Sequence, residues 1–204
     1  MARIDDYQQA RDLAAKALAQ RSTQVIAAQS GIAQWSESRL ILPFLNRVYQ
    51  ISHPGFAFED TAEPAAAVPI QEQVLILHYL DGAGGVHPTG RWIAYREIPG
   101  AAFYYAAFVK RAIDPLKKVF GNQVEGLRKA ATTLGATPVA AGDAGFELCV
   151  FPKVPLQLIL YAGDEEFAPE ANILFDSSVG EILSPEDAAW LAGMVVYRLV
   201  ALAR

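Results

Sequence analysis

Acidic side chains near the end of the chain are spaced in a way that suits acid–base or metal chemistry. Glu165 and Glu166 lie in a polar turn, and Glu170 and Asp176 stand on either side of the apolar run that follows. Two carboxyl groups in one cleft shift each other's pKa, as general acid–base catalysis requires, and carboxylate oxygens also bind hard cations. These acids lack the ligand spacing of a calcium loop, so a solvated turn is the plainer interpretation.

Other catalytic motifs are missing from the sequence. The three histidines fall on different predicted elements without paired spacing, and there is no Gly-x-Ser-x-Gly elbow. Residues 85–90 have the glycine spacing of a phosphate-binding loop, but Arg91 and Trp92 stand where Lys and Ser or Thr are needed. Cys149 lies in the middle of a predicted strand, where a small buried apolar residue is expected. We therefore expect neither a bound metal nor a cofactor.

A strand-to-helix joint carries the densest group of aromatic residues. The run 91–98, which contains Trp92, is predicted as a strand, and a Pro-Gly turn leads into an apolar helix over 101–120. Tyr104 and Tyr105 are adjacent on that helix, so only one of them can face the core fully. The other offers its phenol to a pocket or an interface, or lies at the amphipathic edge of the helix.

The remaining periodicity predicts helices and short strands that position these groups. Spacing and capping residues predict a helical segment over 5–30, helices over 69–81, 101–120 and 123–134, and a last helix from Ser184. β-rich runs predict strands over 39–42, 48–51, 91–98, 146–151, 155–161 and 172–176. Residues 57–68 have no period and predict a mobile loop, either a lid or an exposed connector. We expect one α+β domain over 1–204, with a mostly antiparallel sheet packed by helices.

Composition narrows the function classes. The chain has 204 residues, 52% of them hydrophobic and 19% charged, which suits one well-filled core. A net charge of −5 disfavours nucleic acid, whose phosphates need a basic protein face. Asp5 and Asp6 argue against a secretory signal, and no apolar run is long enough to cross a bilayer. We therefore expect a cytoplasmic protein that binds neither nucleic acid nor membrane.

Several motifs in the chain resemble one family. These motifs are LHYL at 77–80, GRWIAYREIPG at 90–100, the pair Tyr104-Tyr105 with Phe108, GDEEF at 163–167 and EANILFD at 170–176. The resemblance is to uncharacterised prokaryotic proteins, filed under a domain of unknown function and frequent in anaerobes. It implies that the ligand-site candidates are the residues on which the signatures centre: Trp92, Arg96, Glu97, Tyr104, Tyr105, Glu170, Asn172 and Asp176.

The resemblance also implies a biochemical setting. Some relatives carry an additional cysteine-rich segment similar to the iron–sulfur region of corrinoid proteins, which implies a corrinoid or redox context for the family. These 204 residues contain no such segment, and Cys149 alone cannot hold a four-cysteine cluster.

The leading hypothesis is a non-catalytic binding or accessory domain for a small molecule or a protein partner. Its pocket would be lined by the Arg96-Glu97 strand end, by Tyr104 or Tyr105, and by residues 172–176, because a core has no need of so many polar groups beside apolar strands.

Two other hypotheses stay open. The protein is a small enzyme that acts through Glu97, Glu170 or Asp176, with no role assigned to any of them. Alternatively, it is a structural homodimer, because the last helix is apolar on both sides and its second face would suit a partner subunit.

Overall fold

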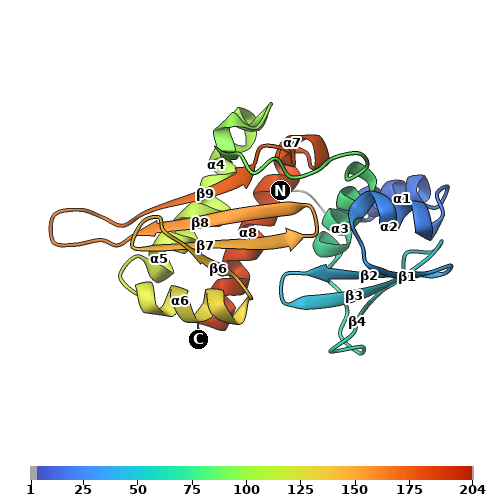
Figure 1. The fold of residues 1–204 in the computed structure, drawn as a ribbon, viewed down its shortest axis with the longest axis horizontal. Helices are drawn as coiled ribbons and strands as arrows, with labels where there is room; N and C mark the ends of the chain where they lie inside the picture. Colours follow the sequence, from blue (N-terminus) through green and yellow to red (C-terminus); the bar gives the residue numbers. More distant parts are fainter. Residues whose placement is uncertain (1–3, 204) are drawn as a thin grey trace. The chain divides into compact units, whose positions relative to one another are not determined.

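The computed structural model describes residues 4–203 and confirms the α+β class (Figure 1). Contacts divide the chain into two compact units, each built from more than one stretch of sequence. Unit 1 contains the chain up to His87 together with residues 151–153 and 181–183, and unit 2 contains the rest. Each unit has its own sheet and its own helices. The expectation of a single domain stays a prediction.

Unit 1 packs three helices with a four-stranded antiparallel sheet of order β1-β2-β3-β4. Its elements are α1 (Ile4–Leu18), α2 (Thr23–Ser30), β1 (Gln34–Ser36), β2 (Arg39–Phe44), β3 (Arg47–Ser52), β4 (Phe58–Asp60) and α3 (Ile70–Gly82). The prediction of a mobile loop over 57–68 is wrong in part, because residues 58–60 form β4. Asp60, at the end of this strand, is buried and accepts a hydrogen bond from Arg47 (2.9 Å). A buried carboxylate with a cationic partner fixes this segment to β3.

An aromatic stack lies at the centre of unit 1. Tyr79 of α3 lies parallel to Phe151, with ring centroids 4.2 Å apart, and Phe44 of β2 packs on Phe151 at 5.0 Å. The Tyr79 hydroxyl donates to the carbonyl of Ser30 at the end of α2 (2.5 Å), so the polar atom of this buried ring is satisfied. Lys153, also buried, donates to the Ala83 carbonyl at the C-terminal end of α3 (3.1 Å), where a cation favours the helix dipole.

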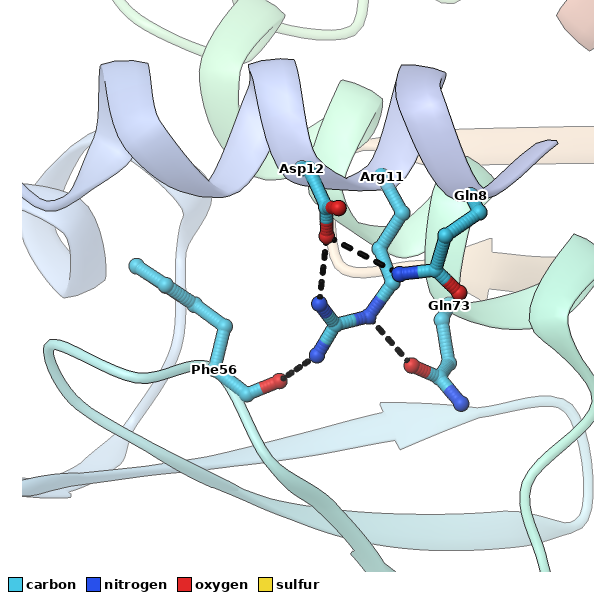
Figure 2. A network of polar contacts seen from close by, with 5 residues as sticks. All are labelled: Gln8, Arg11, Asp12, Phe56 and Gln73. Atoms are coloured by element: carbon cyan, nitrogen blue, oxygen red, sulfur yellow. Dashed lines mark hydrogen bonds and ion pairs between the residues drawn. The ribbon is translucent and has the colours of Figure 1, made fainter. Parts of the chain in front are cut away.

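Arg11 ties α1 to two other parts of unit 1 (Figure 2). Its guanidinium donates to the side-chain oxygen of Gln73 on α3 (2.8 Å), the carbonyl of Phe56 (2.9 Å) and the carboxylate of Asp12 (3.0 Å). Gln8 donates to the same Asp12 oxygen (3.0 Å). The fixed fork of donors on arginine suits several acceptors at once, so this network fixes the position of α1 on unit 1.

Unit 2 is a five-stranded sheet of order β5-β9-β8-β7-β6, with helices on one face. Its strands are β5 (Trp92–Ala94), β6 (Thr137–Val139), β7 (Ala144–Phe151, of which Phe151 is assigned to unit 1), β8 (Val154–Tyr161) and β9 (Glu170–Asp176). Its helical segments are two 3-10 turns (Tyr95–Glu97 and Ala101–Tyr104), α4 (Tyr105–Phe108), a π turn (Val109–Ile113), α5 (Asp114–Phe120), α6 (Val124–Thr133) and α8 (Pro185–Leu202). The short helix α7 (Val179–Ile182) runs from unit 2 into unit 1.

The sheet of unit 2 buries one face. Leu156, Leu158 and Leu160 of β8 are at most 1% exposed, whereas Gln157 and Tyr161 alternate with them on the opposite face. Helix α8 passes behind the strands of this sheet in Figure 1. The other face therefore carries the strand side chains that the core does not use.

Two predicted elements differ in the structure. The strand expected over 91–98 ends at Ala94, because the Glu97 carboxylate accepts the Ala94 amide (2.7 Å) and closes a 3-10 turn. The helix expected over 101–120 begins as a 3-10 turn and passes through a π turn before Pro115. Proline has no N–H for the carbonyl four residues back, and the wider π turn accommodates it while the chain stays helical.

Cys149 also differs from its prediction. It is exposed on β7, since Leu148 and Val150 occupy the buried positions on either side of it and neighbouring strand residues face opposite ways. Its surroundings nevertheless raise the pKa of the thiol, first by partial burial and then through the charge of Glu147. A raised pKa leaves little thiolate at neutral pH, so the side chain is a poor nucleophile despite its exposure.

Candidate functional site

Asp176, one of the predicted site residues, is the centre of a closed hydrogen-bond cluster. It is 1% exposed at the end of β9. Its carboxylate accepts the amides of Gly90 (2.7 Å), Ser178 (2.9 Å) and Thr89 (3.0 Å). The hydroxyls of Ser178 (2.7 Å) and Thr89 (3.1 Å) donate to it as well. We call these four residues the Asp176 cluster.

The Asp176 cluster satisfies its carboxylate from within the chain. Burial by itself raises the pKa of Asp176, but the hydrogen bonds from Thr89, Ser178 and Gly90 outweigh burial and lower the pKa to about 2. The loop that resembled a phosphate-binding loop thus directs its amides at a carboxylate of the same chain. The Asp176 cluster joins that loop to β9, a structural role that needs no ligand.

Arg96 and Tyr105 lie close together, as the leading hypothesis requires. Each of them, however, has the other as its partner, so neither is left over for a ligand. The Arg96 guanidinium lies 3.7 Å from the centroid of the Tyr105 ring, a cation–π contact. Glu97 beside it accepts the Ala94 amide and so completes its own turn. Arg96, Glu97 and Tyr105 thus stabilise the connection between β5 and α4.

Three further candidates lie apart from this pair. Tyr104 interacts with the start of α8, where the charge of Glu186, partial burial and a hydrogen bond to Glu186 raise the pKa of its phenol. Trp92 is paired with Asp176 across β5 and β9, and Asn172 is exposed on β9 opposite Ile159. These three candidates therefore have partners of their own, and the prediction of a shared ligand site stays a prediction.

The two candidate carboxylates of β9 lie at its opposite ends. Glu170 begins the strand and Asp176 ends it, so six residues of extended chain, about 20 Å, separate their Cα atoms. Within residues 4–203, no group of three or more His, Cys, Asp or Glu side chains is arranged to hold a metal ion. The structure thus gives the carboxylates of β9 separate surroundings.

Glu170 instead lines an open pocket beside the loop between β8 and β9. The pocket has a volume of about 490 Å³ and is lined by Lys117, Tyr161, Ala162, Phe167, Ala168, Pro169 and Glu170. We call it the loop pocket. Tyr161 and Glu170 are directly opposite in the β8–β9 register, and Lys117 comes from α5. All of these residues belong to unit 2.

The loop that lines the pocket is held by hydrogen bonds within its turn and at the start of that turn. The Asp164 carboxylate accepts the amides of Phe167 (2.7 Å) and Glu166 (2.8 Å), and these bonds lower the pKa of Asp164. The Gly163 amide donates to the carbonyl of Gly121 (3.1 Å), just after α5. Of the acids in the GDEEF motif, Asp164 therefore has a structural role, since its carboxylate holds the turn.

Two glycines allow the loop to pack closely. A Cβ on Gly121 would lie 2.4 Å from Cγ of Pro169, and one on Gly163 would lie 2.8 Å from Cδ of the same proline. Real Cβ atoms do not come so near, so only glycine lets Pro169 reach both backbones. This packing fixes Pro169, which lines the loop pocket beside Glu170.

The loop pocket joins apolar walls to two charges. Phe167 is 69% exposed and Tyr161 44% exposed, unusual values for large aromatic side chains. Among residues 4–203, the side chains of Lys117 and Glu170 take part in no hydrogen bond or ion pair. An ammonium group, a carboxylate and two rings are therefore available to a bound molecule.

Sequence reasoning found one wall of this pocket and missed the others. The sequence singles out Glu170 but not Lys117, because basic residues at helical spacing are typical of a solvated helix face. Phe167 was noticed only as part of a motif. The available signal was an aromatic residue within a polar turn, where burial does not require one.

Comparison with known proteins adds a family. The chain matches a family described as Domain of unknown function (DUF3786) over residues 22–198, which is most of its length. The chain belongs to the DUF3786 family. This confirms the resemblance to an uncharacterised domain family. No curated protein and no solved structure matches the DUF3786 chain. In the part of the chain that the structure describes, no helix is both long and apolar enough to cross a membrane.

Proposed function

We propose that this DUF3786 domain is a non-catalytic binding or accessory domain that holds a small organic molecule in the loop pocket. The observation that carries the proposal is the set of unpartnered charges, Lys117 and Glu170, beside the exposed rings of Tyr161 and Phe167. Small-molecule sites combine apolar walls with a few polar groups and have volumes of about 300 to 1,000 Å³, a range that includes this pocket.

The two rival functions have less support. An enzyme acting through Glu97, Glu170 and Asp176 needs carboxylates that converge, yet Glu97 closes a turn and Asp176 has its hydrogen bonds filled. A homodimer through α8 needs a free apolar face. Tyr197 is 59% exposed on that helix, but Trp190 is covered by the guanidinium of Arg111 at 4.4 Å from its ring centroid.

We further propose the setting in which the domain works. A net charge of −5 and a lone cysteine suit the cytoplasm, and the family resemblance suits anaerobic metabolism in a redox or corrinoid context. The DUF3786 domain would then act there as a holder of a metabolite and leave the redox chemistry to a partner.

Mass measurement of the intact protein tests the proposal. The protein is purified without oxygen from its own host, and its native mass is compared with its denatured mass. We expect an additional small-molecule mass on the native protein, which Phe167→Ala removes. Phe103→Ala is the matched control, because Phe103 is 86% exposed but lies outside the loop pocket. A native mass equal to the denatured mass, or an adduct that Phe167→Ala retains, would overturn the proposal.

A further inference from the structure

The opposite charges at the loop pocket restrict the kind of molecule that fits it. We propose that the loop pocket takes a zwitterion with a flat apolar body, the chemical class of an aromatic amino acid. This inference rests on the proposed function and names the ligand class for the same pocket. The ligand's carboxylate pairs with Lys117, its ammonium group pairs with Glu170, and its ring packs between Tyr161 and Phe167.

The charges require a ligand that carries both signs. Lys117 and Glu170 line one pocket from α5 and β9, and they form no ion pair with each other or with another described residue. A ligand that covers them removes water from both, and a charge that loses its water without gaining a partner opposes binding. A purely anionic ligand would leave Glu170 without a partner, and a purely cationic ligand would do the same to Lys117. A zwitterion satisfies both groups.

The apolar lining favours a planar body. Two aromatic rings and the ring of Pro169 border the pocket, and no described serine, threonine, asparagine or histidine lines it. Aromatic pairs gain from offset or edge-to-face packing in addition to the burial of apolar area. An aromatic ligand therefore profits from Tyr161 and Phe167 more than a branched aliphatic ligand of similar size does.

The pocket is formed before a ligand arrives. The Asp164 turn fixes the amide of Phe167, and Gly163 anchors the loop to the end of α5. Tyr161 and Glu170 are held side by side by the strand register. Binding then orders few groups. The free energy gained by pairing the charges therefore contributes to affinity, because little of it is offset by the cost of ordering a loop.

Isothermal titration of the full chain with three probes tests the inference. The probes are L-phenylalanine, 2-phenylethylamine, which has no carboxylate, and 3-phenylpropionate, which has no amine. We expect L-phenylalanine to bind at least tenfold more tightly than either single-charge probe, and more tightly than L-leucine. Binding of a single-charge probe within threefold of L-phenylalanine would overturn the inference.

Two single substitutions assign the charges. Lys117→Gln should abolish the preference for L-phenylalanine over 2-phenylethylamine, and Glu170→Gln should abolish its preference over 3-phenylpropionate. Glu165→Gln is the matched control, since Glu165 does not line the pocket, and it should keep both preferences. If no probe binds, the zwitterion class is wrong, while a mass adduct on the purified protein that Phe167→Ala removes would still support the loop pocket as a binding site.

Discussion

Two acidic regions of unit 2 use their carboxylates in opposite ways. Asp176 is buried, and its carboxylate accepts hydrogen bonds from amides and hydroxyls of its own chain. Glu170, at the other end of the same strand, lines an open pocket and has no partner. A filled carboxylate stabilises the fold and has little left to offer a ligand. An unpartnered one beside exposed rings contributes little to stability and is free to bind. The contrast predicts large stability effects at Asp176 and large binding effects at Glu170.

The largest effect on stability is expected from Asp176→Ala. The substitution leaves three amides and two hydroxyls without their acceptor. Each unsatisfied buried donor costs about 1 to 3 kcal/mol, which applies to the amide and the hydroxyl of buried Ser178, whereas Thr89 and Gly90 are exposed and can turn to water. We expect a loss of at least roughly 3 kcal/mol in the free energy of unfolding, measured by urea denaturation. A loss below about 1 kcal/mol would remove the structural role given to the Asp176 cluster.

The pH dependence of stability gives the next effect. The pKa of Asp176 falls from its ordinary 3.8 to about 2 in the folded protein, so the stabilisation is complete above pH 4 and is lost as the pH falls towards 2. The shift corresponds to roughly 2 to 3 kcal/mol. Urea denaturation from pH 5 to pH 2 should show this slope in the wild type and not in Asp176→Asn. Equal slopes in both proteins would assign the acid sensitivity to other groups.

Gly121→Ala should have a smaller effect on stability and a clear effect on binding. The added Cβ would lie 2.4 Å from Pro169, so the loop must move, at a cost of about 1 to 3 kcal/mol. The control is Gly126→Ala in α6, where the nearest atoms are 3.9 Å away and alanine favours the helix. Denaturation and ligand titration together should separate the two variants. Similar behaviour of both would mean that the loop does not depend on the close approach of Pro169.

The smallest effect on stability is expected from Phe167→Ala. Because the side chain is 69% exposed, the free energy of unfolding should change by no more than about 0.5 kcal/mol, while retention of the bound molecule is lost. Thermal unfolding with and without added ligand measures both quantities. A large loss of stability would show that Phe167 supports the fold, as Asp176 does.

Helix ends and the fold class could be predicted from the sequence. Ser184 caps α8 through the amide of Asp187 (3.1 Å), and Gly31 ends α2 in the left-handed conformation, because these positions depend on neighbouring residues alone. The α+β class followed from the same local periodicity. Helix caps depend on a few neighbouring residues, so the sequence alone is enough to predict them.

The roles of the carboxylates were not readable in this way. Asp176 receives hydrogen bonds from Thr89 and Gly90, 87 and 86 residues earlier in the chain, and no local pattern announces them. Lys117 and Phe167 meet at one pocket only because a register and a glycine contact bring them there. The sequence therefore predicts both Glu170 and Asp176 as site residues. Their different surroundings depend on the fold and could not be predicted.

The most direct test compares the two regions in one experiment. Native mass spectrometry of the protein as purified is run on wild type, on Asp176→Asn and on the double variant Lys117→Gln, Glu170→Gln. The account predicts that wild type and the folded fraction of Asp176→Asn carry the same small-molecule mass and that the double variant carries none. A bound mass that survives in the double variant and disappears in Asp176→Asn would contradict it and would place the ligand at the Asp176 cluster.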